Sequence, residues 1–463
     1  MEKKGLPLTL GTEKIRNLLI EYSLPAIVAM VASSLYNITD SIFIGHGVGA
    51  LAISGLAVTF PLMNLSAAFG SLVGAGASTL MSVRLGQKDY GSANRILGNV
   101  FLLNVVLGLA FMIVSLIFLD PILRFFGASS VTLPYAHDYM EIILYGNIFT
   151  HIYLGLNGIL RSSGMPQKAM YATLASVVLN AVLTPIFIFV FNWGIKGSAL
   201  ATVISQIVML GWQIKLFSNK DHFIHLQKGI FKPDPKIIKD SMAIGMSPFL
   251  MNAVSCVIVI IINQTLIRHG GDLAIGAYGI INRVSFLFVM VTMGLNQGMQ
   301  PIAGYNFGAR NYKRVDEVLK LTIFMAIGIM TIGFLIGELC PSLVASAFTK
   351  DQTLIQLAVE GLRIVFVFFP IVGFQMVVTN FFQSIGMAGK AIFLSLSRQL
   401  LFLLPFLLTL PSIYGLKGVW YSMPAADLLA SLVAAYMLFV NFRKFIKRNA
   451  EKTMNSRENT IYE

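Results

Sequence analysis

Long apolar stretches separated by short polar segments recur along the whole 463-residue chain. A membrane-crossing helix needs about 20 mostly apolar residues, and hydropathy windows of about 19 residues mark twelve such stretches. They lie at 18–44, 50–80, 96–119, 138–160, 169–191, 195–216, 240–266, 274–300, 318–338, 361–384, 391–410 and 416–441. Because the apolar runs are continuous rather than alternating, they predict an all-α integral membrane protein with twelve transmembrane helices.

Composition agrees with this prediction. Apolar residues make up 56% of the chain and charged residues only 12%. Charged residues are about a quarter of a typical soluble chain, so a soluble single-core domain is excluded. Intrinsic disorder is excluded as well, because it requires low hydrophobicity.

The net charge of +13 is explained by topology. If the termini and the even-to-odd connections share one face, that face carries 26 of the 34 Lys and Arg residues, and the opposite face carries five. Lys and Arg concentrate on the cytoplasmic side of membrane proteins, so both termini are predicted to be cytoplasmic. The basic face is expected to contact anionic membrane lipid, and no nucleic-acid partner is predicted.

The two halves of the sequence repeat each other. A shift of 222 residues places Gly76 on Gly298 and Gly86 on Gly308, with further short matches along both halves. Repeats in the same orientation form two lobes with the substrate site between them. We therefore predict two parallel six-helix repeats, an N-lobe and a C-lobe, around a central cleft. The predicted parts are a cytoplasmic N-terminus (1–17), the N-lobe (18–216), an inter-lobe loop (217–239), the C-lobe (240–441) and a basic tail (442–463).

Asp40, on predicted helix 1, is the most informative polar residue inside a span, because no basic residue lies near it in sequence. Polar groups within hydrocarbon are expensive and tend to be functional. A lone carboxylate in a low-dielectric setting takes up a proton or binds a cation, and either behaviour suits ion coupling. The alternative is an Asp near its helix end that is hydrated from outside.

Neutral oxygens on helices 5 and 6 could complete a site with Asp40. Asn180 and Thr184 lie four residues apart on one helix face, and Thr202 lies on the next helix. Hard cations favour oxygen ligands, so Na⁺ is possible at Asp40, Asn180 and Thr202. The alternative role for each of these neutral side chains is hydrogen bonding between helices.

Pro25 on helix 1 removes a backbone donor and leaves the carbonyl of Glu21 unpaired, so a bend is predicted there. The bend could be a hinge that straightens or a fixed kink.

In the second half, Asp427 on helix 12 and Arg398 on helix 11 are predicted to form an ion pair. The alternative is that Asp427 contacts a cationic substrate. Gln375 and Gln383 on helix 10 contribute to a polar inner face that could also contact substrate. No phosphate-loop, zinc-protease or nucleophile-elbow pattern occurs, so we predict neither an enzyme nor a cofactor beyond a coupling ion.

Five short motifs carry a resemblance to a known family. They are Leu35-Tyr36-Asn37-Ile38-Thr39-Asp40, Gly86-Gln87-Lys88-Asp89-Tyr90, Leu160-Arg161-Ser162-Ser163-Gly164, Gly194-Ile195-Lys196-Gly197-Ser198-Ala199 and Phe382-Gln383-Ser384-Ile385-Gly386. On a duplicated twelve-helix frame, the chain resembles the bacterial branch of the multidrug and toxic compound extrusion (MATE) family from about Ile15 to Phe445.

The resemblance implies an antiporter of the bacterial inner membrane that exports drugs or organic cations in exchange for Na⁺ or H⁺. It also implies a cation site with an Asp on helix 1, an Asn and an Asp on helix 5, and a Thr on helix 6. Asp40, Asn180 and Thr202 match this pattern, but Thr184 stands where the family has its second Asp. The site would then carry one formal negative charge.

The leading function is therefore a secondary-active multidrug exporter in which two lobes rock about the cleft, acting as a monomer. The alternative is a flippase for lipid-linked oligosaccharides from the same superfamily. Its cleft would be more basic, because its substrate carries phosphate. An ion channel is less favoured, because rings of pore-lining charge are scarce.

Overall fold

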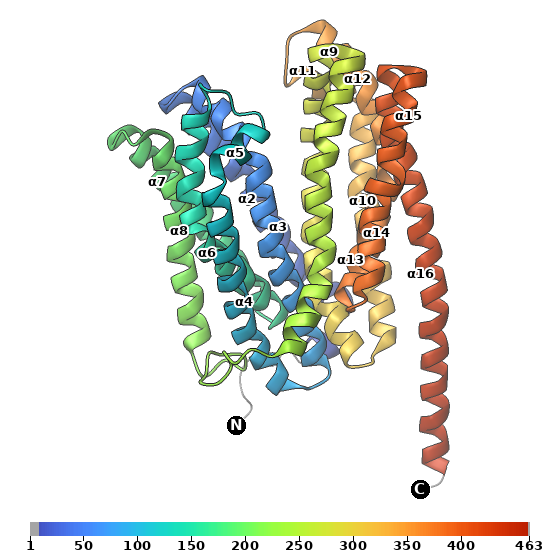
Figure 1. Cartoon of the computed structure of the whole chain (residues 1–463). Helices are drawn as coiled ribbons and strands as arrows, with labels where there is room; N and C mark the ends of the chain where they lie inside the picture. The colour runs from blue at the N-terminus through green and yellow to red at the C-terminus, as the bar shows by residue number, and fades with distance from the viewer. Residues whose placement is uncertain (1–8, 462–463) are drawn as a thin grey trace.

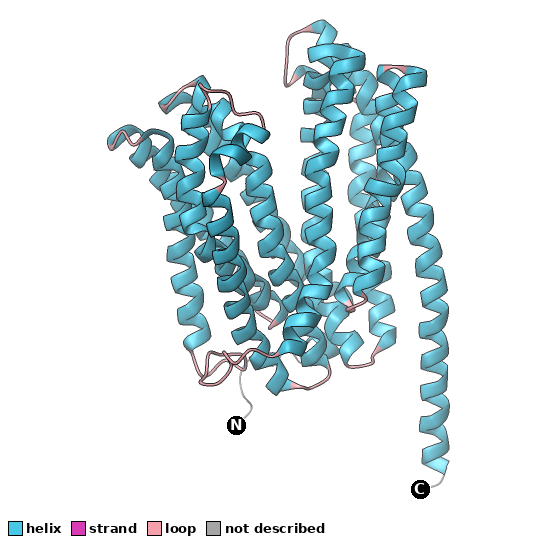
Figure 2. Ribbon diagram, in the orientation of Figure 1, coloured by secondary structure: helices cyan, strands magenta, loops and turns pink. Residues whose placement is uncertain are grey.

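The computed structural model describes residues 9–461, apart from the side chains of Asn37, Ile38, Ala50, Asp272 and all residues after Asn441. Over this range the chain forms helices and no strand (Figures 1 and 2). The first half comprises α1 (Thr9–Thr12), α2 (Ile15–Gly47), α3 (Ala50–Gly86), α4 (Tyr90–Ile117), α5 (Leu119–Phe125), α6 (Leu133–Ser162), α7 (Pro166–Pro185), the π-helix η1 (Ile186–Val190) and α8 (Gly194–Ser218). The second half comprises α9 (Pro235–Gly308), α10 (Tyr312–Leu339), α11 (Pro341–Ser346), α12 (Gln352–Phe366), α13 (Phe369–Ser384), α14 (Ala388–Leu396), the π-helix η2 (Ser397–Leu403), α15 (Leu404–Tyr414) and α16 (Leu416–Ile461).

The described residues contain eleven helices long and apolar enough to cross a membrane, or twelve if the bent pair α12 and α13 counts as one span. This confirms the predicted all-α membrane fold. Two of the spans lie within α9 and meet at Gly271, which has φ 67° and ψ −165°. Only glycine adopts that conformation readily, so the residue type permits the sharp break between them.

Predicted helix 10 is the span whose form differs most from the prediction. The range 361–384 was expected as one helix, whereas the structure has α12 and α13, bent by 52°. Pro370 lies in the first turn of α13. A proline cannot donate a backbone hydrogen bond, and its ring clashes with the carbonyl four residues earlier. A straight helix through Phe366 is therefore disfavoured.

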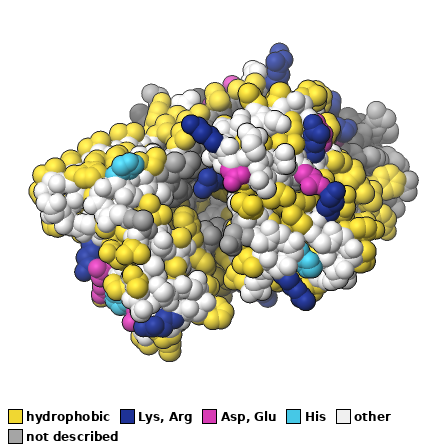
Figure 3. Space-filling model, turned by 90° about the horizontal axis from the view of Figure 1, so that it is seen from above, with side chains coloured by type: hydrophobic (Ala, Val, Ile, Leu, Met, Phe, Trp, Pro, Cys, Tyr) yellow, Lys and Arg dark blue, Asp and Glu magenta, His cyan; other side chains and the backbone are white. Residues whose placement is uncertain are grey.

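The helices form two lobes, one from each half of the sequence (Figure 1). The linker 219–234 that joins the lobes lies at the bottom of that view, and the C-terminal end of α16 points to the same side. We call this the basal end and the opposite end the upper end. Seen from above, the surface is hollowed between the two lobes (Figure 3).

The internal repeat is visible in two equivalent ion pairs. Lys196 lies 3.2 Å from Asp138 in the N-lobe, and Lys417 lies 3.0 Å from Glu360 in the C-lobe. Lys196 and Lys417 are 221 residues apart, and Asp138 and Glu360 are 222 apart. Each pair joins the first turn of the last helix of a lobe to the lobe's fourth span, so the two lobes share one architecture.

The lobes meet at the basal end, where α2 and α3 pack on α9. Glycines bring the backbones close together. A Cβ on Gly86 would lie 1.9 Å from the carbonyl oxygen of Tyr305, and one on Gly308 would lie 2.1 Å from that of Val83. The molecule is therefore closed at its basal end by backbone contact between the lobes.

The linker is shorter than the predicted loop 217–239. α8 ends at Ser218, and α9 begins at Pro235 after its N-cap residue Asp234. The last apolar span, Leu416–Asn441, matches the prediction, although α16 continues to Ile461. Of the predicted termini, residues 1–8 and the side chains of the tail 442–463 lie outside the described residues.

Candidate functional site in the N-lobe

Asp40 lies in α2, and only 5% of its surface is exposed. Ser198 on α8 donates its hydroxyl toward both carboxylate oxygens, with Oγ 2.7 Å from Oδ1 and 2.8 Å from Oδ2. Thr184 on α7 has its Oγ1 3.4 Å from Oδ1 of Asp40. Three helices of the N-lobe therefore meet at this carboxylate.

A second layer of the site surrounds the hydroxyl of Thr202. Asn180 donates through Nδ2 to Thr202 Oγ1 at 3.1 Å, and the hydroxyl of Tyr36 lies 2.8 Å from the same atom. Thr202 donates in turn to the carbonyl of Ser198 at 3.2 Å. Thr184 links the two layers, because its hydroxyl also lies 3.2 Å from Oδ1 of Asn180. The structure thus brings Asp40, Asn180, Thr184 and Thr202 into one network.

The electrostatics of the network rest on a single charge. No Lys, Arg or His forms an ion pair with Asp40 within the described part of the chain. The same residues hold no group of three or more His, Cys, Asp or Glu side chains suited to a metal ion. The possible ligands around Asp40 are neutral amide and hydroxyl oxygens. That set of oxygens suits one hard monovalent cation, or one proton on the carboxylate.

Ser198 and Tyr36 belong to this network but were not predicted as site residues. The sequence contained a signal for both. Ser198 precedes Thr202 by four residues on α8, and Tyr36 precedes Asp40 by four on α2. Residues four apart share one helix face, so each lies on the face that already carried a predicted site residue.

In the C-lobe, Nε of Arg398 lies 2.5 Å from Oδ1 of Asp427. The Asp427 side chain is 6% exposed and that of Arg398 is 36% exposed. Arg398 lies in η2, one of the two π-helices of the structure's described range, and the next residue, Gln399, donates to Ser255 of α9 at 2.7 Å. The two opposite charges predicted to pair are therefore in contact, and the wide turn of η2 also joins this helix to α9.

The remaining predicted residues are placed as follows. Gln375 is buried and donates to Thr379 one turn along α13, at 3.3 Å. Gln383 is buried near the end of the same helix. Pro25 lies inside α2, which continues from Ile15 to Gly47 without a break. A substrate role for the two glutamines and a hinge at Pro25 stay predictions.

Two repeated helical lobes in a membrane, closed at one end and hollowed at the other, define a two-lobed polytopic membrane protein. The chain belongs to the MatE family, whose model matches residues 25–186 and 243–408. This confirms the resemblance seen in the sequence.

Individual proteins agree with the family assignment. Multidrug export protein MepA of Staphylococcus aureus is 29% identical over 427 residues, which cover 91% of this chain and 93% of MepA. A crystal structure of MATE in the bent conformation superposes with a TM-score of 0.90 at 25% identity, over 96% of this chain and 99% of that one. An outward-facing multidrug resistance MATE family transporter of the MOP superfamily superposes with a TM-score of 0.89 at 24% identity, with the same coverage.

Proposed function

We propose that this protein is a secondary-active multidrug exporter that moves small organic compounds, often cations, out of the cell in exchange for Na⁺ or H⁺. Membership of the MatE family supports the export of small molecules, and so does the similarity to multidrug export protein MepA over nearly the whole chain. The protein acts in this proposal as a monomer in the bacterial inner membrane, in contact with lipid.

The observation that carries ion coupling is the buried Asp40, which has no basic partner among the residues that the structure describes. With Na⁺, the carboxylate, the amide oxygen of Asn180 and the hydroxyls of Thr184 and Thr202 would hold the ion. With H⁺, the proton would reside on a carboxylate oxygen. In both cases the net charge of the network changes from −1 to zero. A buried charge carries a desolvation cost, and binding of the ion or proton removes that cost. The binding can therefore shift the equilibrium between two conformations.

The basal end is assigned to the cytoplasm in this proposal. The predicted cytoplasmic connections, including the linker 219–234, lie at that end, and the sequence places most Lys and Arg residues in them. The hollow at the upper end then faces outward. Export requires that the lobes part at the basal end to admit substrate and close again before release.

The flippase alternative predicts a basic cleft for a phosphate-bearing substrate. Arg398 is instead neutralised by Asp427, and Asp40 adds a negative charge to the N-lobe. With Arg283, the fourth charge that the sequence places near the cleft, these groups have no net positive charge, and such a set does not favour a polyanion.

The test is ethidium efflux from reconstituted vesicles under separately imposed Na⁺ and H⁺ gradients. We expect saturable efflux that requires one of the two gradients, with vesicles lacking the protein as the control. Efflux at the same rate without any ion gradient would contradict antiport, and saturating kinetics would then separate facilitated transport from a channel.

A further inference from the structure

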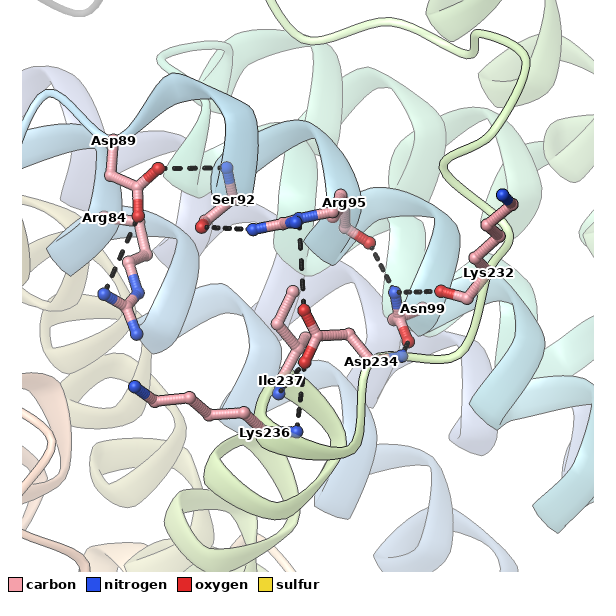
Figure 4. Close-up of polar contacts among 9 residues, drawn as sticks. All are labelled: Arg84, Asp89, Ser92, Arg95, Asn99, Lys232, Asp234, Lys236 and Ile237. Atoms are coloured by element: carbon pink, nitrogen blue, oxygen red, sulfur yellow. Dashed lines mark hydrogen bonds and ion pairs between the residues drawn. The ribbon is translucent and has the colours of Figure 1, made fainter.

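The start of the first C-lobe helix is bound to the N-lobe at the basal end (Figure 4). Asn99 on α4 donates through Nδ2 to the carbonyl oxygen of Lys232 at 3.2 Å, and its Oδ1 accepts from the backbone N–H of Asp234 at 2.9 Å. Asn99 is 2% exposed, so water competes little for these bonds. We call this contact the N-lobe clasp.

Asp234 connects the clasp to α9 itself. Its Oδ1 accepts from the backbone N–H groups of Lys236 and Ile237, at 3.0 and 3.3 Å, and so caps the helix. Its other oxygen lies 4.0 Å from Nε of Arg95 on α4. The cap residue of α9 is therefore bonded to the helix that it starts and to the opposite lobe.

The start of the first N-lobe helix is bound in the same way to the C-lobe. Asn306, near the end of α9, donates through Nδ2 to the carbonyl of Leu10 at 2.9 Å. Arg314 on α10 donates to the carbonyls of Leu10 and Glu13, at 3.0 and 2.6 Å, and its Nε donates to Oδ1 of Asn306 at 3.0 Å. We call this contact the C-lobe clasp, and α2 begins two residues after Glu13.

The two clasps use the same chemistry at equivalent places. The carbonyls that accept from the two asparagines, Leu10 and Lys232, are 222 residues apart, which is the spacing of the internal repeat. The donors are not repeat equivalents, because Asn99 and Asn306 are separated by only 207 residues. Duplication alone therefore does not explain the shared contact, and each lobe supplies its own asparagine.

We propose that the two clasps latch the basal end closed and must release when the lobes part there. Each clasp joins one lobe to the segment that enters the other, beside the glycine contacts that close this end. Six residues beyond Pro235, α9 touches α3, where a Cβ on Gly76 would lie 1.9 Å from the carbonyl oxygen of Ser241. When the lobes part, this part of α9 moves away from the N-lobe. The N-lobe clasp lies just before it in the chain, so its hydrogen bonds must break in the same movement.

The test measures access to a buried thiol between the lobes. Ser82 on α3 is fully buried, and a Cβ on Gly304 of α9 would lie 2.9 Å from its Cβ. A Ser82→Cys reporter, in a chain whose own Cys256 and Cys340 are replaced by Ser, is exposed to a membrane-impermeant maleimide from the basal side. This proposal rests on the rocking motion of the proposed function, but labelling needs neither substrate nor an ion gradient, so the two can fail separately.

Asn99→Ala and Asn306→Ala should each raise the labelling rate about five- to thirtyfold, as expected for the loss of one or two buried hydrogen bonds from the closed state. The double variant should show roughly the product of the two effects, because both bias one equilibrium. Asn311→Ala is the matched control, since this exposed asparagine beside α10 has no side-chain cap bond. Its labelling should equal that of the reporter alone.

Rates equal to the Asn311→Ala control in both clasp variants would overturn the latch. Reduced transport without faster labelling would overturn the latch as well, because the clasps would then act as hinges that stay formed in both the closed and the open state. If the alanine variants do not fold, Asn306→Asp retains an acceptor for Arg314 and removes the Nδ2 donor, which bonds the carbonyl of Leu10 and that of Ile302 on the same helix. It should still raise labelling, and an unchanged rate would overturn the C-lobe clasp.

Discussion

At the scale of single residues, the buried carboxylate of Asp40 receives hydrogen bonds from hydroxyl groups where an ion pair with a basic side chain would be expected. Ser198 donates to both carboxylate oxygens, and Thr184 is the second hydroxyl within reach. A carboxylate can accept more hydrogen bonds than these two donors supply. The site therefore retains the capacity for one proton or one cation, which is the property that coupling requires.

The first prediction concerns the charge of Asp40. Asp40→Asn retains the size of the side chain and removes the carboxylate, so gradient-driven efflux should fall to the level of empty vesicles. The variant should remain folded in the membrane, because an amide oxygen can still accept from Ser198. Transport at the native rate at matched expression would remove Asp40 from the coupling role.

The second prediction concerns Ser198, which only the structure identified. Ser198→Ala removes the shortest donor to the carboxylate, a charge-assisted bond whose loss costs about 1.5–3 kcal/mol. The variant should have a lower Tm in Na⁺-free buffer and gain more Tm than the native protein when the coupling ion is added. The matched control is Ser205→Ala, a buried serine of the same helix that donates only to the carbonyl of Ala201 at 2.6 Å. Equal ion responses in the two variants would exclude Ser198 from the site.

At the scale of helices, irregular turns position several of the polar side chains predicted from the sequence. The π-helix η2 carries Arg398 to Asp427 on α16 and Gln399 to Ser255 on α9. The break between α12 and α13 follows from Pro370. Departures from regular helix therefore occur at two of the three C-lobe elements that carry the predicted polar residues, η2 and α13.

The third prediction treats Arg398 and Asp427 as a pair. Removing one partner leaves an uncompensated buried charge, so Arg398→Met or Asp427→Asn should each lower the free energy of unfolding by about 3 kcal/mol. That value is the lower end of the range for buried pairs, and it applies because Arg398 is partly exposed. The double variant should cost less than the worse single change. Thermal unfolding of all four proteins measures this coupling.

Efflux of one cationic and one neutral dye provides the second readout for the same variants. Additive stability effects would contradict the ion pair. Loss of cationic efflux alone in Asp427→Asn, with stability unchanged, would instead assign this carboxylate to substrate recognition.

At the scale of the whole molecule, closure of the basal end depends on positions without side chains. Gly86 and Gly308 are repeat equivalents, and each faces a backbone carbonyl of the other lobe, at Tyr305 and Val83. A backbone carbonyl cannot move aside as a flexible side chain can. The fully closed state therefore requires glycine at both positions.

The fourth prediction follows from this contact. Gly308→Ala should destabilise the closed basal end by about 1–3 kcal/mol, the usual cost of overpacking. Spin labels at Gln87 and Lys313, with the native cysteines replaced, should report longer distances in this variant. Gly328→Ala is the control, because an added Cβ there meets no atom within 4 Å. The same distance distribution in Gly308→Ala and in the control would show that closure tolerates a side chain.

The sequence by itself determined the spans, the repeat and the isolation of Asp40. Hydropathy marks each span because every residue of a membrane helix faces either lipid or packed protein, so the signal is local. The 222-residue spacing predicted two lobes, and the absence of a nearby base identified the lone carboxylate.

Only the tertiary structure decided which polar side chains meet. The rotation and depth of each helix in the membrane follow from packing against its neighbours. The hydropathy of a single segment gives no information on either of them. The hydrogen bonds from Ser198 to Asp40 and from Asn306 to Leu10 therefore became visible only in the folded chain. Each of them joins residues more than 150 positions apart in sequence.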